Sequence, residues 1–264
     1  MSTNYYYLVS SLPTLEFGEF ANVPIEDLVE KILTNLTSKD LELVDYLRKS
    51  RDIQNLRSMG EKWQTFRELG MIPTKTFQDP DIELELPEEW ERYILSQKGE
   101  KPISIDWVWL NYFEEGLRTD DIFVQVWARH ELALWTVTAI IRRGRFEGVQ
   151  GSGLNFDELE RSENPLIQEI FAFSRLPDFG LGHEYDWAYL VRDIFETANP
   201  KEIELAIDKF RWNFLEGLTA NRHFSHEVIL GYVLKLLICE RWQRLDKKLG
   251  EDRLKSILGG ISGE

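Results

Sequence analysis

"NPKEIELAIDKFRWNF", residues 199–214, is the stretch that decides the fold class. Asn199 suits the N-cap of a helix, and Pro200 suits the first helical position. Glu202 stands at the third helical position, where a carboxylate favours a helix start. The apolar residues then recur at the spacing of a helix, namely at Ile203, Ile207, Phe210 and Phe214. This spacing predicts an amphipathic helix with one face in the core.

Similar start signals recur elsewhere in the chain. They stand at Pro24 with Glu26 and Asp27, at Thr37-x-x-Asp40, and at Asn164-Pro165. The first of them opens a stripe of Leu28, Val29, Ile32, Leu33 and Leu36. Further helices are expected near residues 87–96, 104–118, 121–143, 184–197 and 224–248. The sequence therefore predicts an all-α protein.

Strand signals are confined to one short segment. Within residues 82–86, isoleucine and leucine alternate with glutamate, and a period of two is typical of a strand. The prediction allows at most one short β element, in which Ile82–Leu86 pairs with Tyr5–Val9. Tyr5–Val9 is in any case expected to be an ordered core element. The chain is predicted to form a single helical domain, 1–264, with a division into two lobes near 96–102 left open.

Composition limits the possible partners. The chain of 264 residues has 46 acidic and 31 basic residues, a formal charge of −15. This balance argues against a nucleic-acid partner, because phosphate binding needs a basic face. Cys239 is the only cysteine, which fits a reducing cytoplasm. The most apolar long stretch, Asp121–Ile141, has Arg129, His130 and Glu131 at its centre, so no membrane span is expected.

Candidates for chemistry are few. His223 and His226 are three residues apart with Glu227 beside them, which is half of a metal site. The alternative is that both histidines bond to neighbouring groups near a helix start. The glycines at 148, 151 and 153 lack the preceding strand and the Gly-Lys-Ser/Thr ending of a phosphate loop. We therefore expect no catalytic residue, no cofactor and no metal.

Arg142, Arg143 and Arg145 form the densest basic cluster of this acidic chain. They end a predicted helix beside a glycine-rich segment. Cations favour a helix C-terminus, and this alone could explain them. The alternative is a polar contact with a partner protein, since loops often carry function. We predict the partner interface at these three residues.

Three stretches resemble one known family. They are "YYYLVSSLPTL" from Tyr5, "DYLRKSRDIQNL" from Asp45 to Leu56, and "YVLKLLICERWQRLDKKLG" from Tyr232 to Gly250. The first resembles the start of the C-type (also called d-type) subunit of V/A-type ATPases, the second its first internal helix, and the third its closing helix. The whole chain resembles a bacterial family of uncharacterised proteins encoded with V-type ATPase genes.

The resemblance implies an elongated multi-helix collar without catalytic activity. Such a collar belongs to the central stalk of a V-type ATPase, where it links the shaft subunits to the membrane proteolipid ring. It passes rotation between ATP hydrolysis and ion transport, and lies in the cytoplasm on the inner face of the membrane. Two alternatives remain open, namely an unrelated helical scaffold or adaptor, and a helical-bundle metalloenzyme that uses His223 and His226.

Overall fold

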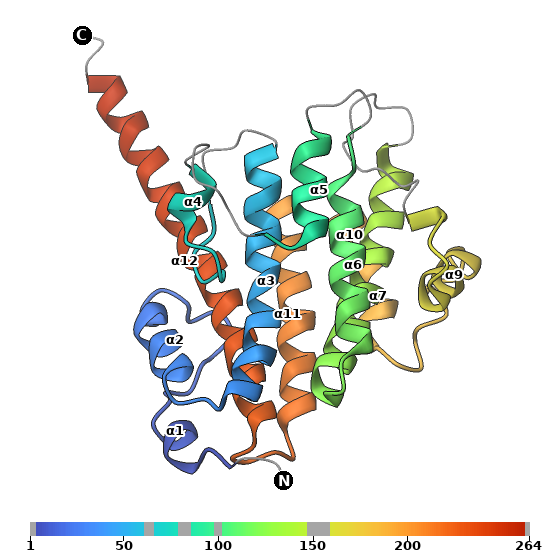
Figure 1. The fold of residues 1–264 in the computed structure, drawn as a ribbon. Helices are drawn as coiled ribbons and strands as arrows, with labels where there is room; N and C mark the ends of the chain where they lie inside the picture. Colours follow the sequence, from blue (N-terminus) through green and yellow to red (C-terminus); the bar gives the residue numbers. More distant parts are fainter. Residues whose placement is uncertain (1–3, 61–65, 79–85, 98–101, 147–158, 262–264) are drawn as a thin grey trace.

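A computed structural model describes residues 4–60, 66–78, 86–97, 102–146 and 159–261, and the fold is all-α (Figure 1). Within these ranges no residue lies in a strand. The helices are, in chain order, α1 (Tyr6–Ser10), α2 (Ile25–Leu33), α3 (Ser38–Gly60), α4 (Thr74–Gln78), α5 (Glu88–Ser96), α6 (Ile105–Arg118), α7 (Ile122–Phe146), α9 (Pro165–Ala172), the short 3₁₀ helix η1 (Asp186–Tyr189), α10 (Val191–Thr197), α11 (Pro200–Thr219) and α12 (His226–Ile261).

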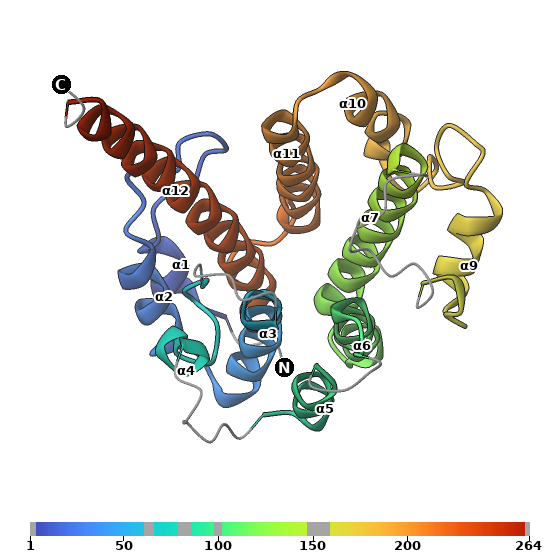
Figure 2. The same cartoon turned by 90° about the horizontal axis from the view of Figure 1, so that it is seen from above.

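The long helices form a ring. Going round it, α3 packs on α6, α6 on α7, α7 on α10, α10 on α11, α11 on α12, and α12 again on α3. Seen from above, α3 and α12 lie on one side, α6 and α7 on the other, and α11 between their far ends (Figure 2). Helix α2 packs on the outside against α12, and α9 on the outside against α7.

Local signals explain where several helices begin. The side chain of Asn199 accepts a hydrogen bond from the Glu202 backbone N–H, and Glu202 accepts one from the Asn199 N–H, each at 3.0 Å. This capping box starts α11 as predicted. Asn164 caps α9 through the Leu166 N–H at 3.0 Å. At α3 the Asp40 N–H donates to the Thr37 hydroxyl at 3.3 Å, but the Thr37 N–H donates to the Tyr5 hydroxyl instead of to Asp40.

The short strand that the prediction allowed at Tyr5–Val9 is not formed, because Tyr6–Ser10 is helix α1 and Tyr5 is its N-cap residue. Tyr5 and Leu8, three residues apart, are buried, whereas Tyr6 and Tyr7 are 54% and 93% exposed, so the burial follows a helical period. The Tyr5 hydroxyl donates to Asp40, which anchors the segment to the start of α3. Of the second proposed strand, residues 82–85 lie outside the described residues, as do residues 98–101 of the proposed lobe division.

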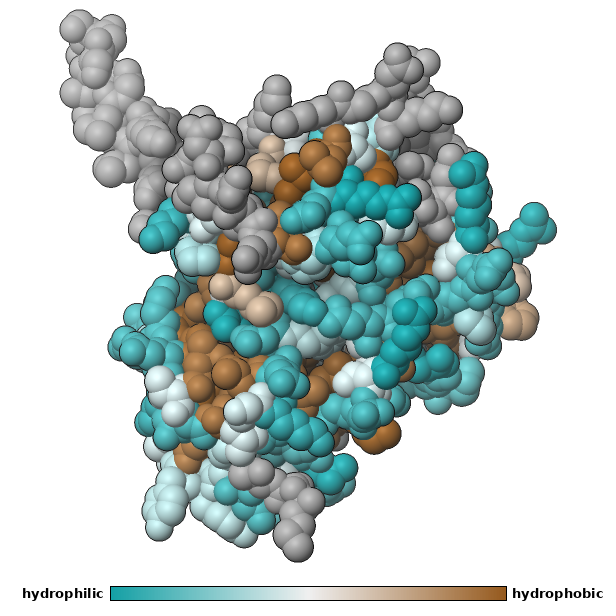
Figure 3. Space-filling view, in the orientation of Figure 1, coloured by the Kyte–Doolittle hydropathy of each residue, from teal (hydrophilic) through white to brown (hydrophobic). Residues whose placement is uncertain are grey.

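The apolar core lies between the ring helices and their outer neighbours. It includes most of the segment 228–239 of α12, with Leu236 fully buried and Cys239 1% exposed. Leu132, Leu134 and Val137 of α7 are likewise fully buried. On the face shown in Figure 3, hydrophilic residues cover most of α6, and hydrophobic residues gather over α2 and the adjacent part of α3. Within the described ranges, no helix is both long and apolar enough to cross a membrane.

Candidate functional site

The helix ring encloses a cavity of about 410 Å³. Its wall is built from single faces of α3, α6, α7, α11 and α12 together with Arg67, which follows α3. On α7 and α11, for example, the lining residues recur at intervals of three and four, so each helix presents one stripe to the cavity. The charged lining residues are the arginines Arg51, Arg57, Arg67, Arg142, Arg211 and Arg241 and the carboxylates Glu131, Glu204 and Asp208.

Asp208 lies at the centre of the charged wall. It is 1% exposed, and it accepts hydrogen bonds from Arg211, Arg241 and the Trp242 indole, each at 2.9 Å. Arg241 also pairs with Glu204, which in turn pairs with Arg142 at 3.1 Å. These contacts join α7, α11 and α12 through one connected ion-pair network. Such a network resists deformation, because Asp208, Glu204 and Arg241 are each held by more than one partner.

The network continues to Glu131 on α7. Arg211 Nε lies 2.9 Å and 3.0 Å from the two Glu131 oxygens. Burial alone would raise the pKa of Glu131, but the charge of Arg211 outweighs it and lowers this pKa to about 2. Behind Glu131, the buried His130 accepts a hydrogen bond from the Trp187 indole at 3.1 Å. Burial lowers the pKa of His130, so the ring is neutral and its remaining proton faces Glu131.

Two arginines of the wall have donors that no described residue uses. Arg51 is 5% exposed, and its Nε has no hydrogen-bond partner among the described residues, although Nη1 donates to Gln54 at 3.0 Å and Nη2 to the Leu237 carbonyl. Burial lowers the pKa of Arg51 to about 10, so it is still charged at neutral pH. The guanidinium of Arg67 makes no hydrogen bond or ion pair with any residue that the structure describes.

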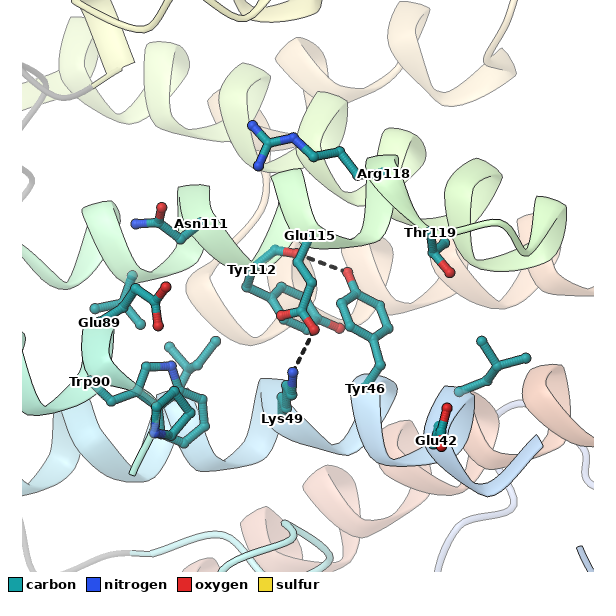
Figure 4. Close-up of a pocket in the computed structure, with 14 residues that line it drawn as sticks. Glu42, Tyr46, Lys49, Glu89, Trp90, Asn111, Tyr112, Glu115, Arg118 and Thr119 are labelled. Atoms are coloured by element: carbon teal, nitrogen blue, oxygen red, sulfur yellow. Dashed lines mark hydrogen bonds and ion pairs between the residues drawn. The ribbon is translucent and has the colours of Figure 1, made fainter. Parts of the chain in front are cut away.

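A second hollow of about 590 Å³ lies between α3, α5 and α6 (Figure 4). Some of its polar groups bond to one another. Lys49 pairs with Glu115 at 2.5 Å, and the Tyr46 hydroxyl donates to the Tyr112 carbonyl at 3.0 Å. The Tyr46 and Tyr112 rings stack with their centroids 4.7 Å apart. Burial raises the pKa of Tyr46, so it remains a protonated donor and supplies no base.

The structure separates Arg142 from Arg143, two of the three arginines of the predicted interface. Arg142 points to the cavity, where it pairs with Glu204 and lies over the Phe195 ring. Arg143 lies on the outer surface and pairs with Glu160. Arg145 is in the last turn of α7, and its side chain lies outside what the structure describes. The cluster is thus at least two differently placed groups, and its role as an interface stays a prediction.

The two histidines of the metal alternative do not converge. His226 begins α12, and its Nε2 lies 2.7 Å from Asp121 Oδ2 while its Nδ1 lies 3.3 Å from Glu227. Its hydrogen bond with Asp121 raises the pKa of His226. His223 is exposed and precedes the helix. In the ranges that the structure covers, no group of three His, Cys, Asp or Glu residues could hold a metal ion.

The cavity was missed at the sequence level, although a signal for it exists. Glu204, Asp208 and Arg211 repeat at intervals of four and three beside the apolar stripe of the same helix. A charged stripe beside an apolar one is usually the solvated face of a helix, whereas here it lines the cavity. Its partners on α7 and α12 are far away in sequence, so only the fold reveals them.

Comparison with known proteins identifies the family. A family model described as "Protein of unknown function (DUF2764)" matches residues 1–264, so the chain belongs to this family. No curated protein matches the sequence. No solved structure matches it either.

Proposed function

We propose that this protein is a non-catalytic collar subunit of the central stalk of a V-type ATPase. In this role it links the shaft subunits to the membrane proteolipid ring and passes rotation between ATP hydrolysis and ion transport. It would lie in the cytoplasm, peripheral to the inner face of the membrane. The proposal rests on the resemblance of three sequence stretches to the C-type subunit of V/A-type ATPases, and on one structural observation about them.

That observation is that the three stretches pack together. The first stretch, at α1, joins the start of α3 through the Tyr5 hydroxyl, and its Tyr5 N–H donates to the Phe224 carbonyl at 2.6 Å, just before α12. The third stretch returns to the first, since the Tyr232 hydroxyl donates to the Pro13 carbonyl at 2.9 Å. Arg51 of the second stretch donates to Leu237 of the third. Segments up to 219 residues apart thus form one unit.

The helix ring also suits a part that transmits torque. Long helices packed round a closed circuit deform little, because protein interiors are as dense as organic crystals. The ion-pair network across α7, α11 and α12 adds cross-links on the inner side of the ring. These features favour a mechanical role.

The test is reconstitution from purified parts. The protein is mixed with the shaft subunits and, separately, with the detergent-solubilised proteolipid ring, and co-elution is measured by size-exclusion chromatography at low and raised salt. We expect a stable complex with both. Failure to bind either partner under all conditions would overturn the collar proposal, and would favour an unrelated scaffold or adaptor.

A pair of variants tests the predicted interface separately. Arg143→Glu reverses an exposed charge at the end of α7, and Arg118→Glu reverses one at the other end of the bundle, where α6 ends (Figure 1). We expect the first to weaken binding to a partner and the second to leave it unchanged. Equal behaviour of both variants would remove the interface assignment and leave the collar proposal standing.

A further inference from the structure

The cavity inside the helix ring has more positive than negative charge. Besides Arg57, which has contacts of its own, five arginines and three carboxylates of the described residues line it. This is an excess of two positive charges in a chain whose net charge is −15. Glu240 lies just behind the wall, 3.8 Å from Arg51, but it also pairs with Arg244 at 3.2 Å. Including both residues leaves the excess unchanged.

An excess of buried charge costs stability unless a counter-charge is present. Burial is the largest effect on Arg51 and lowers its pKa, and the charges of Arg67 and Arg241 lower it further, against the opposing effect of Glu240. The pKa of Arg67 is likewise lowered first by burial and also by Arg241 and Arg244, although Glu240 raises it. Both guanidinium charges are therefore disfavoured in the wall of the cavity.

We propose that this cavity binds a small anion with two or more phosphate groups. Two parallel N–H groups of a guanidinium match the spacing of two phosphate oxygens. The resulting hydrogen bonds are strongest where water is excluded. The Nε of Arg51 and the guanidinium of Arg67 supply donors that no residue of the described ranges uses. A polyphosphate concentrates several negative charges within a short distance, which suits an excess of positive charge around a space of about 410 Å³.

The aromatic part of the wall determines which source of phosphate fits. Trp109 and Trp135 line the cavity and are half-buried, so each ring presents some surface to it. A flat base of a nucleotide could stack on such a ring, whereas an inorganic polyphosphate could not. The shared chemistry is the phosphate chain, and the two sources differ in whether tryptophan contributes.

Arg67 is the best residue for a test. Its backbone is held independently of its side chain, because Asn55 accepts from the Arg67 N–H and donates to the Arg67 carbonyl at 2.8 Å. Arg67→Gln should therefore remove the charge and leave the segment in place. Arg175→Gln is the matched control, since Arg175 is exposed and does not line the cavity.

The experiment is calorimetric titration of the full chain with tripolyphosphate at about 50 mM ionic strength, where surface charges are already partly screened. We expect one site per chain, an affinity loss of about tenfold or more in Arg67→Gln, and no loss in Arg175→Gln. A melting temperature that rises with tripolyphosphate gives a second readout. Absence of binding, or equal loss in both variants, would overturn the proposal.

Two further titrations identify the source. ATP that binds tenfold tighter than tripolyphosphate and quenches tryptophan fluorescence would assign the site to a nucleotide. Equal affinity without quenching would assign it to the phosphate chain alone. Adenosine that binds while tripolyphosphate does not would contradict the proposal. This inference does not depend on the collar function, because neither shaft nor ring takes part in the titration.

Discussion

Helix α3 has two polar sides that meet different surroundings. On one side Asp52 accepts from the Met71 and Ile72 N–H groups at 2.8 Å and 3.3 Å, and Asn55 pairs with both backbone groups of Arg67. On the adjoining side, one turn before Asn55, Arg51 lines the cavity, and its Nε has no hydrogen-bond partner among the described residues. The first side is completed by the backbone of its own chain, whereas the second is not.

The difference separates structural polar residues from candidate binding residues. Asp52 and Asn55 are both fully buried, yet their partners are fixed, so they hold the segment from Arg67 to Ile72 against α3. Arg51 is almost as buried but belongs to a wall with excess charge. Burial alone therefore says little about function. What matters is whether the chain itself supplies the partners.

The largest expected effect comes from the carboxylate that holds the charged wall together. Asp208→Asn should lower the free energy of unfolding by about 3 kcal/mol, because it leaves Arg211 and Arg241 with less compensation in a buried place. Urea denaturation measures this change in the free energy of unfolding. Asp193→Asn, at an exposed position, is the control and should change stability by less than about 0.5 kcal/mol. A loss below about 1 kcal/mol for Asp208→Asn would contradict this assignment.

On the completed side of α3, a smaller loss is expected. Asn55→Ala should cost about 2 kcal/mol, since it leaves the Arg67 N–H and carbonyl without their partner. The Arg67 amide should also exchange faster with solvent hydrogen, while amides in the middle of α7 stay protected. Unchanged exchange at Arg67 would show that Asn55 does not hold this segment.

The smallest expected effect depends on pH. The hydrogen bond to Asp121 raises the pKa of His226 above its usual 6.5, and Glu227 and Asp40 act in the same direction. The stabilisation is therefore fully present below about pH 6.5, and is lost as the pH rises through the higher folded-state pKa. His226→Gln should flatten the stability profile between pH 6 and pH 8, by on the order of 1 kcal/mol. An unaltered slope would contradict the pairing.

Much of the fold could be predicted from the sequence. Caps at Asn164 and Asn199 and the apolar periodicity act within a few residues, so they indicate helix positions directly. The segment 184–197 was predicted as one helix, but it is the 3₁₀ helix η1 followed by α10. Tyr5–Val9 was expected to be an ordered core element with a short strand allowed there, and the structure forms helix α1 instead, with Tyr5 held at its start by Asp40.

The cavity could not be predicted in the same way. Arg51 and Asp52 are neighbours in one polar run. No local signal tells for which of them other parts of the chain satisfy every polar atom of the side chain. The answer depends on Leu237, Glu240 and Arg67, which come from α12 and the segment after α3. Arg142 was predicted to belong to a partner interface because it lies in a basic cluster at a helix end. The fold places it in the cavity wall instead of on the outer surface.

The most direct test of the contrast between the two sides is to compare Arg67→Gln with Asn55→Ala in the ligand-free protein. Melting temperatures are measured at low ionic strength, where charge repulsion is least screened. The predicted result is a decrease for Asn55→Ala and an increase for Arg67→Gln, because burial, together with the repulsion of Arg241 and Arg244, disfavours the Arg67 charge despite the attraction of Glu240. A decrease for Arg67→Gln as large as that for Asn55→Ala would contradict it, because Arg67 would then be a structural residue with its charge already compensated.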